Sequence, residues 1–354
     1  MIRPHLMSSL VLRHYVLSIS AGVALLAGCG GSQPPIGAPG AMPQSRAIAT
    51  HAARGGSWML PEVRRAKELL YISDQATDYV YVYDYKTRRL LGRLHGFYKP
   101  AGQCVDSKGD VWITDSTAEA AVEYAHGAKR HMNRIRTLGL ANSCSIDPTS
   151  GNLAVSNAIT PRGGSNIEVF SFTGKRKVYS NSACQGIVQV GYDNNGDLYV
   201  SASSQESSAY VCELPHGAGR LVTVSIDKSI VRPGGVMWDG KYIAFTDSLY
   251  AFDYTAIYQA QPTSSGGLKV VGETDFKGCD GGLTFITQPF IVGSKNTPSN
   301  DQQGNAVVAS NELCGFGSTG YEFSYWAYPE GGDPTHTLFD APINPAGEVV
   351  SIAP

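Results

Sequence analysis

The chain has 354 residues, which is enough for one large domain or two ordinary ones. Charged residues make up only 16% and the formal net charge is −2, so the basic surplus typical of a nucleic-acid-binding protein is absent. Hydrophobic residues at 42% and aromatic residues at 10% exclude a disordered chain. With 40 glycines and 19 tyrosines, the composition favours a turn-rich, all-β exported protein.

The N-terminus has the pattern of an export signal. Residues 1–28 carry two arginines, no acidic residue and, from Tyr15, an apolar run of fourteen residues. A membrane-spanning helix needs about 20 residues, so the run predicts a signal peptide instead. It ends in Leu-Ala-Gly followed by Cys29, which resembles the bacterial lipoprotein box, in which the cysteine thiol carries diacylglycerol. The resemblance implies an exported protein, periplasmic or surface-exposed, that is held at the cell-envelope membrane only by lipid on Cys29.

Residues 29–67 are predicted to be the lipidated cysteine and a flexible stalk. Most of this segment is rich in Gly, Pro, Ala and Ser and has no hydrophobic period. The apolar patch Trp58-Met59-Leu60 is expected to pack against the following domain, with partner binding as the alternative.

Six cysteines remain after Cys29, an even number that fits up to three disulfides in an exported protein. They allow 15 connectivities, and buried free thiols are the alternative. Sequential pairing is favoured: Cys104 with Cys144, Cys184 with Cys212, and Cys279 with Cys314.

The region from residue 68 to residue 354 contains an internal repeat. Each unit has a short apolar strand, a D-x-x-G or D-G turn and a second β-rich strand, and the turn glycines Gly109, Gly151, Gly196 and Gly240 are 42, 45 and 44 residues apart. Such hairpin turns need a residue at positive φ. A period in the forties without helical segments indicates a β-propeller with four antiparallel strands per blade.

The two ends of this region are complementary. The C-terminal Pro345-Ala346-Gly347 copies the lead into a first strand at Pro100-Ala101-Gly102, but no second strand follows it. The repeat region begins at Leu69 with a second strand that has no first strand before it. We therefore expect the C-terminal strand to complete the N-terminal blade and close a six-bladed ring without free sheet edges. Seven blades are the alternative.

The P-x-G leads, the D-x-x-G turns and the strand endings ITD, VSN and FTD resemble the NHL-repeat and SMP-30-like superfamily of six-bladed β-propellers. The resemblance covers residues 68–354 and concerns the fold more than the activity, because that superfamily includes lactonases, lyases, scaffolds and many exported proteins of unknown activity. In the lactonases a divalent cation at the channel mouth polarises the substrate carbonyl. Asp74, Asp115 and Asp247, which end three second strands, are the weak candidates for such a site, with hydrogen bonding inside the blade as the alternative.

Other motifs favour structural interpretations. The G-x-G-x-x-G at 315–320 precedes a β-like aromatic run rather than a helix, so a hairpin loop is expected. The acidic turn at Asp193 lacks the twelfth-position Glu of a calcium loop. His126 and His216 recur at equivalent positions, which favours a role in turns. The alternating tyrosines from Tyr79 to Tyr85 are expected to pack between blades, with ligand stacking as the alternative.

No catalytic residue and no cofactor is predicted, and the chain is more readily a binding protein than an enzyme. The leading hypothesis is an envelope lipoprotein that binds a protein or glycan through one propeller face. The alternative is a metal-dependent hydrolase or lyase that works at the channel mouth.

Overall fold

The computed structural model describes residues 55–203, 209–249, 254–277, 290–292, 305–311, 322–338 and 342–354. Residues 49–354 belong to one compact unit. The predicted signal peptide, the lipid-bearing Cys29 and most of the predicted stalk lie outside the described residues. Across the described ranges, no helix has the length and apolar character needed to cross a membrane.

The described elements are antiparallel β-strands and one short helix, η1 (Pro61–Arg64). We call the sheets A to F. Sheet A has the order β1-β4-β3-β2-β25, formed by β1 (Trp58–Met59), β2 (Glu68–Asp74), β3 (Tyr79–Asp84), β4 (Leu90–Leu94) and β25 (Pro345–Ile352). Sheet B contains β5 (Pro100–Val105), β6 (Val111–Asp115), β7 (Ala120–Tyr124) and β8 (Asn133–Arg136). Sheet C contains β9 (Ala141–Ile146), β10 (Leu153–Asn157), β11 (Asn166–Phe170) and β12 (Arg176–Tyr179).

The remaining sheets follow the same plan. Sheet D contains β13 (Ile187–Tyr192), β14 (Leu198–Ser203), β15 (Ala209–Leu214) and β16 (Val222–Val224). Sheet E contains β17 (Pro233–Trp238), β18 (Ile243–Leu249), β19 (Tyr254–Pro262) and β20 (Leu268–Lys277). Sheet F contains β21 (Phe290–Val292), β22 (Asn305–Asn311), β23 (Glu322–Tyr328) and β24 (His336–Leu338).

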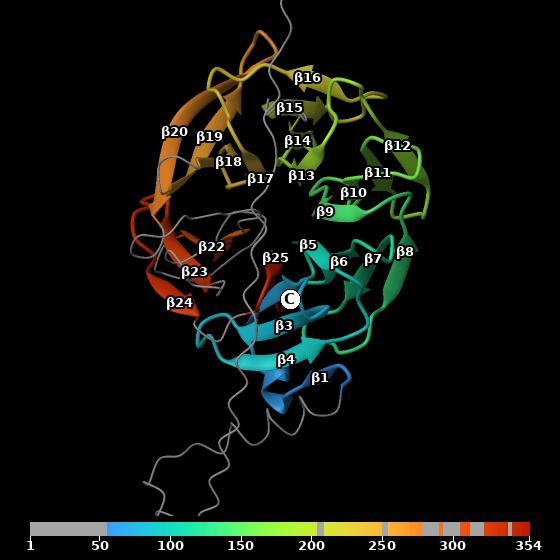
Figure 1. The fold of residues 1–354 in the computed structure, drawn as a ribbon, viewed down its shortest axis with the longest axis vertical. Helices are drawn as coiled ribbons and strands as arrows, with labels where there is room; N and C mark the ends of the chain where they lie inside the picture. The colour runs from blue at the N-terminus through green and yellow to red at the C-terminus, as the bar shows by residue number, and fades with distance from the viewer. Residues whose placement is uncertain are drawn as a thin grey trace, which may run out of the picture. The chain divides into compact units, whose positions relative to one another are not determined.

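The sheets are arranged around a common centre, with β25 of sheet A and β5, β9, β13 and β17 of sheets B to E innermost (Figure 1). Successive inner strands are neighbours from β25 through β5, β9 and β13 to β17. The all-β propeller with antiparallel four-stranded blades is therefore confirmed. The strand count per sheet differs from the expectation, because five sheets have four strands and sheet A has five.

The extra strand of sheet A comes from the predicted stalk. Trp58 and Met59 pair with Arg93 and Gly92 of β4, and the side chains of Trp58 and Leu60 are buried. The apolar patch thus packs against the domain as expected, but ordered structure begins before the predicted boundary at residue 68. Strand β1 could not be recognised from the sequence, because two residues are too few to show a hydrophobic period.

The C-terminus closes the N-terminal sheet as predicted. Strand β25 pairs with β2 from Glu68 opposite Ile352 to Asp74 opposite Pro345. This pairing joins segments about 280 residues apart and gives β2 a hydrogen-bonded neighbour on both sides. The inner edge of β2 is consequently covered by β25 rather than open to another chain.

Sheet B holds this closing strand in place. The ring nitrogens of His126 lie 2.7 Å from Ser351 Oγ and 3.0 Å from the carbonyl oxygen of Ala66, while the Ser351 hydroxyl donates to the carbonyl of Gly109 at 2.5 Å. The Gly127 N–H also donates to the buried hydroxyl of Tyr71. The ring of His126 thus contacts the closing strand and the segment before β2 rather than its own turn, and its burial lowers its pKa.

The four turn glycines all have positive φ, as the repeat predicted. Gly109 has an additional constraint, because a Cβ there would lie 2.1 Å from the carbonyl oxygen of Ile352 in the closing strand. A Cβ on Gly151 would meet nothing within 4 Å. The turn in sheet B is thus shaped both for its own hairpin and for contact with sheet A.

Aromatic packing fills the space between sheets A and F. In β3 the valines at 80 and 82 are fully buried, and the alternating tyrosines lie on the opposite face. Tyr83 and Tyr85 are buried in one cluster with Phe323 and Tyr325 of β23. The prediction that the tyrosine run packs between blades is confirmed for these residues.

Two disulfides follow the predicted sequential pairing. Cys104 in β5 is bonded to Cys144 in β9, so the inner strands of sheets B and C are joined covalently. Cys184, which precedes β13, is bonded to Cys212 in β15. Cys279 and Cys314 lie outside the described residues.

Replacing Gly109 with Ala should be more damaging than replacing Gly151. G151A introduces only the strain of a positive φ, about 1 kcal/mol. G109A adds the clash with the closing strand, and overpacking of this kind costs a further 1–3 kcal/mol, roughly. Urea unfolding of the two variants checks the difference, and equal losses would show that β25 does not press on this turn.

The Cys104–Cys144 bond should contribute strongly to stability. It closes a segment with a sequence separation of 40, for which chain entropy predicts about 4 kcal/mol. C104A/C144A should therefore have its unfolding midpoint at a lower urea concentration than the parent. A reducing agent should make the difference between the two midpoints smaller. Equal midpoints under oxidising conditions would contradict this expectation.

Candidate functional site

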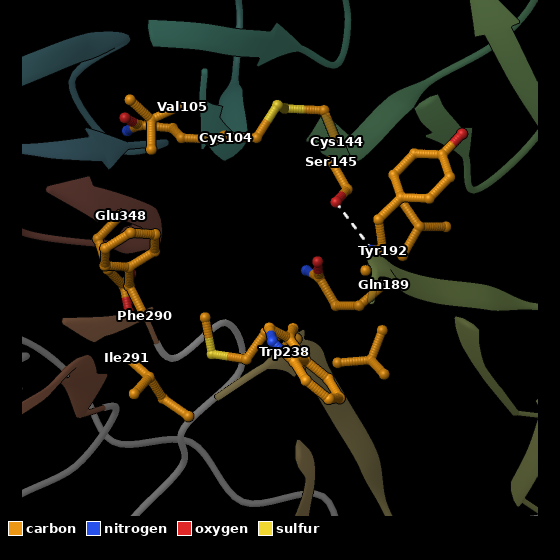
Figure 2. Close-up of a pocket in the computed structure, with 16 residues that line it drawn as sticks. Cys104, Val105, Cys144, Ser145, Gln189, Tyr192, Trp238, Phe290, Ile291 and Glu348 are labelled. Atoms are coloured by element: carbon orange, nitrogen blue, oxygen red, sulfur yellow. Dashed lines mark hydrogen bonds between the residues drawn. A yellow bond between two sulfur atoms is a disulfide. The ribbon is translucent and has the colours of Figure 1, made fainter. Parts of the chain in front are cut away.

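A cavity of about 120 Å³ lies where the inner strands converge. Its lining includes one polar or aromatic residue from each inner strand: Gln103, Ser145, Gln189, Trp238, Phe290 and Glu348. Figure 2 shows Gln189 pointing into the space, with Glu348 and Phe290 on the opposite side. The convergence of six strands makes this the central channel expected of a propeller.

The polar groups of the channel are tied to the surrounding strands. The Gln103 amide nitrogen donates to Ser73 Oγ at 2.8 Å and to the Gly347 carbonyl at 3.2 Å. The Tyr192 N–H donates to Ser145 Oγ at 3.0 Å (Figure 2). The amide oxygen of Gln103 is buried without a hydrogen-bond partner among the described atoms. The channel therefore presents oxygen acceptors and aromatic surface to its interior.

The structure does not bring Asp74, Asp115 and Asp247 together in this channel. Asp74 and Asp115 are the last residues of β2 and β6, whereas β18 continues two residues beyond Asp247. All three side chains are fully buried and accept hydrogen bonds from the backbone that leads into the innermost strand of the same sheet. Over the described part of the chain, no group of three or more His, Cys, Asp or Glu side chains is placed to hold a metal ion. These carboxylates therefore form hydrogen bonds inside their own blades, which was the alternative to a metal site.

Burial raises the pKa of Asp115 to about 6, against the opposing influence of the Tyr98 N–H and the Arg134 guanidinium. Arg134 Nη2 lies 3.6 Å from Asp115 Oδ2. The equivalent position in sheet C is Asn157, so an uncharged amide also fits this strand end. The raised pKa thus reflects a structural carboxylate in a dry setting.

A larger cavity of about 780 Å³ lies between sheets B and C. We call it the B–C groove. Its aromatic lining consists of the buried Trp112 and Phe170 and of Phe172, which is 89% exposed. Its polar lining includes Asp106, Asp110, Glu123, Asn133 and Arg134.

Carboxylates crowd one wall of the groove. Burial raises the pKa of Asp110, and the neighbouring charge of Asp106 raises it further. Burial likewise raises the pKa of Glu123, which accepts a hydrogen bond from the Asn133 amide and is close to Asp110. Ligand groups that donate hydrogen bonds would relieve this concentration of negative charge.

A smaller cavity of about 350 Å³ lies between sheets C and D and includes His216 in its lining. The backbone N–H of His216 donates to Asp197 Oδ1 at 2.6 Å. The Asp193 carboxylate accepts the N–H groups of Asn195 and Asp197 inside the same turn, as expected for a hairpin rather than a calcium loop. The glycine-rich segment 315–320 lies outside the described residues.

Comparison with solved structures supports the fold. No protein-family model matches the chain, and no curated protein matches it. A solved structure titled as a nidogen/laminin complex matches 81% of this chain and 99% of that one, with 12% identity and a TM-score of 0.58. The chain has a β-propeller fold.

Two further solved structures are similar to the chain. A protein of unknown function from Bacteroides caccae has a TM-score of 0.53 and 13% identity, with 80% of this chain and 99% of that chain covered. A functionally unknown protein from Desulfotomaculum acetoxidans DSM 771 has a TM-score of 0.52 and 11% identity, with 81% and 99% covered. At these identities the likeness concerns the propeller fold alone.

The residues that line the channel and the B–C groove could not be identified from the sequence. Glu348 directly follows the repeated Pro-Ala-Gly, and Gln103 holds the corresponding place after Pro100, so the repeat did mark positions on the inner strands. Nothing in the sequence showed which side of each strand faces the channel. The groove residues come from separate strands and turns, and only the packing of sheets B and C brings them together.

Changing Asp115 to Asn should alter how stability depends on pH. A carboxyl group with a raised folded pKa contributes stability that is fully present below its unfolded pKa of about 3.9 and is lost as the pH rises through about 6. D115N has no such titration. The melting temperature of the parent minus that of D115N should therefore fall between about pH 4.5 and pH 7, and a flat or rising difference would contradict the raised pKa.

Proposed function

We propose that this protein is an exported binding protein that holds a protein or glycan partner in the B–C groove. The observation that carries the proposal is the groove itself, a cavity of about 780 Å³ whose wall combines an exposed aromatic ring with crowded carboxylates. Small-ligand sites commonly have volumes of roughly 300–1,000 Å³. An aromatic ring beside carboxylate and amide groups suits a sugar or a polar peptide segment.

The walls of the groove are suited to hold a fixed shape. The Cys104–Cys144 bond joins the inner strands of sheets B and C, which form the two sides. On β8, Asn133 donates a hydrogen bond to Glu123 of the adjacent strand β7, and Arg134 forms an ion pair with Asp115 of β6. A preorganised site loses less conformational entropy when a ligand binds.

The cellular setting is part of the same proposal. The signal-like residues 1–28 and the lipoprotein-like Cys29 support an address at the bacterial cell envelope, with lipid as the membrane anchor. The repeat motifs support a place in the NHL-repeat and SMP-30-like superfamily. They also support a ring of six blades, in which the five-stranded sheet A counts as the sixth.

The metal-dependent hydrolase or lyase receives less support. The three candidate aspartates are engaged in their own blades and are not part of the channel lining. The described lining contributes a single carboxylate, Glu348, together with amide oxygens. These residues do not fit the set of converging carboxylates that the resemblance implied, and no catalytic step is derived from them.

Binding to the groove can be tested with F172S/E123Q, which removes the exposed ring and one carboxylate. The matched control is V178S, because Val178 is 47% exposed and lies outside the groove lining. Full-length protein with Cys29 changed to Ser would be applied to a glycan array and to a solubilised envelope fraction. We expect a retained glycan or protein whose affinity falls by about tenfold, or about 1.4 kcal/mol, in F172S/E123Q and is unchanged in V178S. Retention of nothing above background, or equal retention by all proteins, would overturn the proposal.

A further inference from the structure

One end of the propeller carries exposed apolar side chains at a repeated position. Tyr98, Val231 and Ile343 are 64%, 56% and 60% exposed. Each lies two residues before the proline that begins a first strand, in the segments Tyr-Lys-Pro, Val-Arg-Pro and Ile-Asn-Pro. We call these three side chains the apolar tips. Their shared place in sheets B, E and A shows that exposure here belongs to the repeat and is not an accident of one loop.

The backbone beneath each tip is fixed by a buried carboxylate. The Tyr98 N–H donates to Asp115 Oδ1 at 2.7 Å, and the Val231 N–H donates to Asp247 Oδ2 at 3.0 Å. The Ile343 N–H donates to Asp74 Oδ2 at 3.0 Å. Because all three carboxylates are fully buried, they hold the tips outward without placing their own charge on the surface.

Sheet C provides a related element. Leu138 is 43% exposed, and its N–H donates to the buried Glu168 at 2.7 Å. Ile159 in the adjoining loop is 58% exposed, and its carbonyl accepts the N–H of Leu140 at 2.9 Å. A carboxylate-held apolar side chain therefore occurs at the same end of four sheets.

The tips lie at the opposite end of the blades from the D-x-x-G turns. In sheet B, Tyr98 precedes β5 and Asp106 follows it, so the tip and the turn are at the two ends of one strand. Equivalent positions in successive blades of a propeller have the same height along the ring axis. The apolar tips consequently lie at one height on one face of the propeller, and this face is separate from the turns that line the B–C groove.

Basic side chains accompany the tips. Lys99 follows Tyr98 directly, Arg232 follows Val231 directly, and Arg162 lies in the loop of Ile159; all three are exposed. This combination of separated apolar side chains with adjacent cations is complementary to the interface of an anionic bilayer. Apolar groups enter the acyl boundary there while cations meet lipid phosphates.

We propose that this face of the propeller docks on an anionic lipid surface through Tyr98, Val231, Ile343 and the neighbouring Leu138, with Lys99 and Arg232 meeting the headgroups. A lipid interface accepts isolated apolar side chains at one level without a matching shape, whereas a protein partner would need a separate pocket for each. The face is distinct from the groove of the proposed function, so either can fail without the other.

Vesicle sedimentation tests the proposal with full-length protein carrying Cys29→Ser. The tip variant is Y98S/V231S/I343S, and the matched control is M132S/V178S/V271S. The control removes three apolar side chains that are 48%, 47% and 42% exposed at other positions. All proteins share residues 1–67, so any binding by that region is common to them. Matching melting temperatures would establish that the variants are folded.

We expect the parent and the control to bind vesicles of phosphatidylcholine mixed with phosphatidylglycerol, and the tip variant to bind about tenfold more weakly or worse. K99Q/R232Q should bind the mixed vesicles more weakly than the parent does, while any binding to phosphatidylcholine alone should not change, and added salt should weaken binding of the parent to the mixed vesicles. Equal binding by the tip variant, an equal loss in the control, or no binding by the parent would overturn the proposal. A parent that is dimeric in sedimentation while the tip variant is monomeric would also overturn it, because the face would then be an interface between two copies.

Discussion

Backbone pairing between β25 and β2 is the interaction on which the rest of the structure depends. It joins the last described strand to one of the first, so the cost in chain entropy of a very long loop must be met by contacts at the closure. Those contacts come from both sides: β2 is also paired with β3, while His126 and Gly109 of sheet B engage the Ser351 hydroxyl. The position of every inner strand around the channel follows from this closure.

A closed ring gives each inner strand two ends with different surroundings. At one end are the hairpin turns, the B–C groove and its carboxylates. At the other end are the leads into the first strands, where buried aspartates organise the backbone and exposed apolar side chains project. The same repeat therefore produces two chemically distinct faces, and the Cys104–Cys144 bond keeps two neighbouring blades in register. Binding chemistry can differ at the two faces without any change in the ring.

Features that depend on local chemistry could be predicted from the sequence, whereas features that depend on how the sheets pack could not. Gly109 and its equivalents could be predicted because a hairpin turn needs positive φ, and the closing strand because Pro345-Ala346-Gly347 copies another lead. Strand β1 could not be predicted, since two residues have no period. The aspartates at the strand ends were visible, but whether they met one another depended on blade geometry, and they bond within their own blades. The groove was invisible because its residues converge only when sheets B and C pack.

Hydrogen exchange at β2 and β25 tests ring closure most directly. If the pairing belongs to the cooperative core, the hydrogen-bonded amides of β2 from Leu69 to Ser73 and those of β25 from Gly347 to Ser351 should exchange only through global unfolding. Their exchange free energy should equal that of β9 and β10 in the disulfide-linked part of the ring. Exchange of β25 well ahead of β9 and β10, at a free energy near zero, would show that the last strand is frayed and would contradict the account.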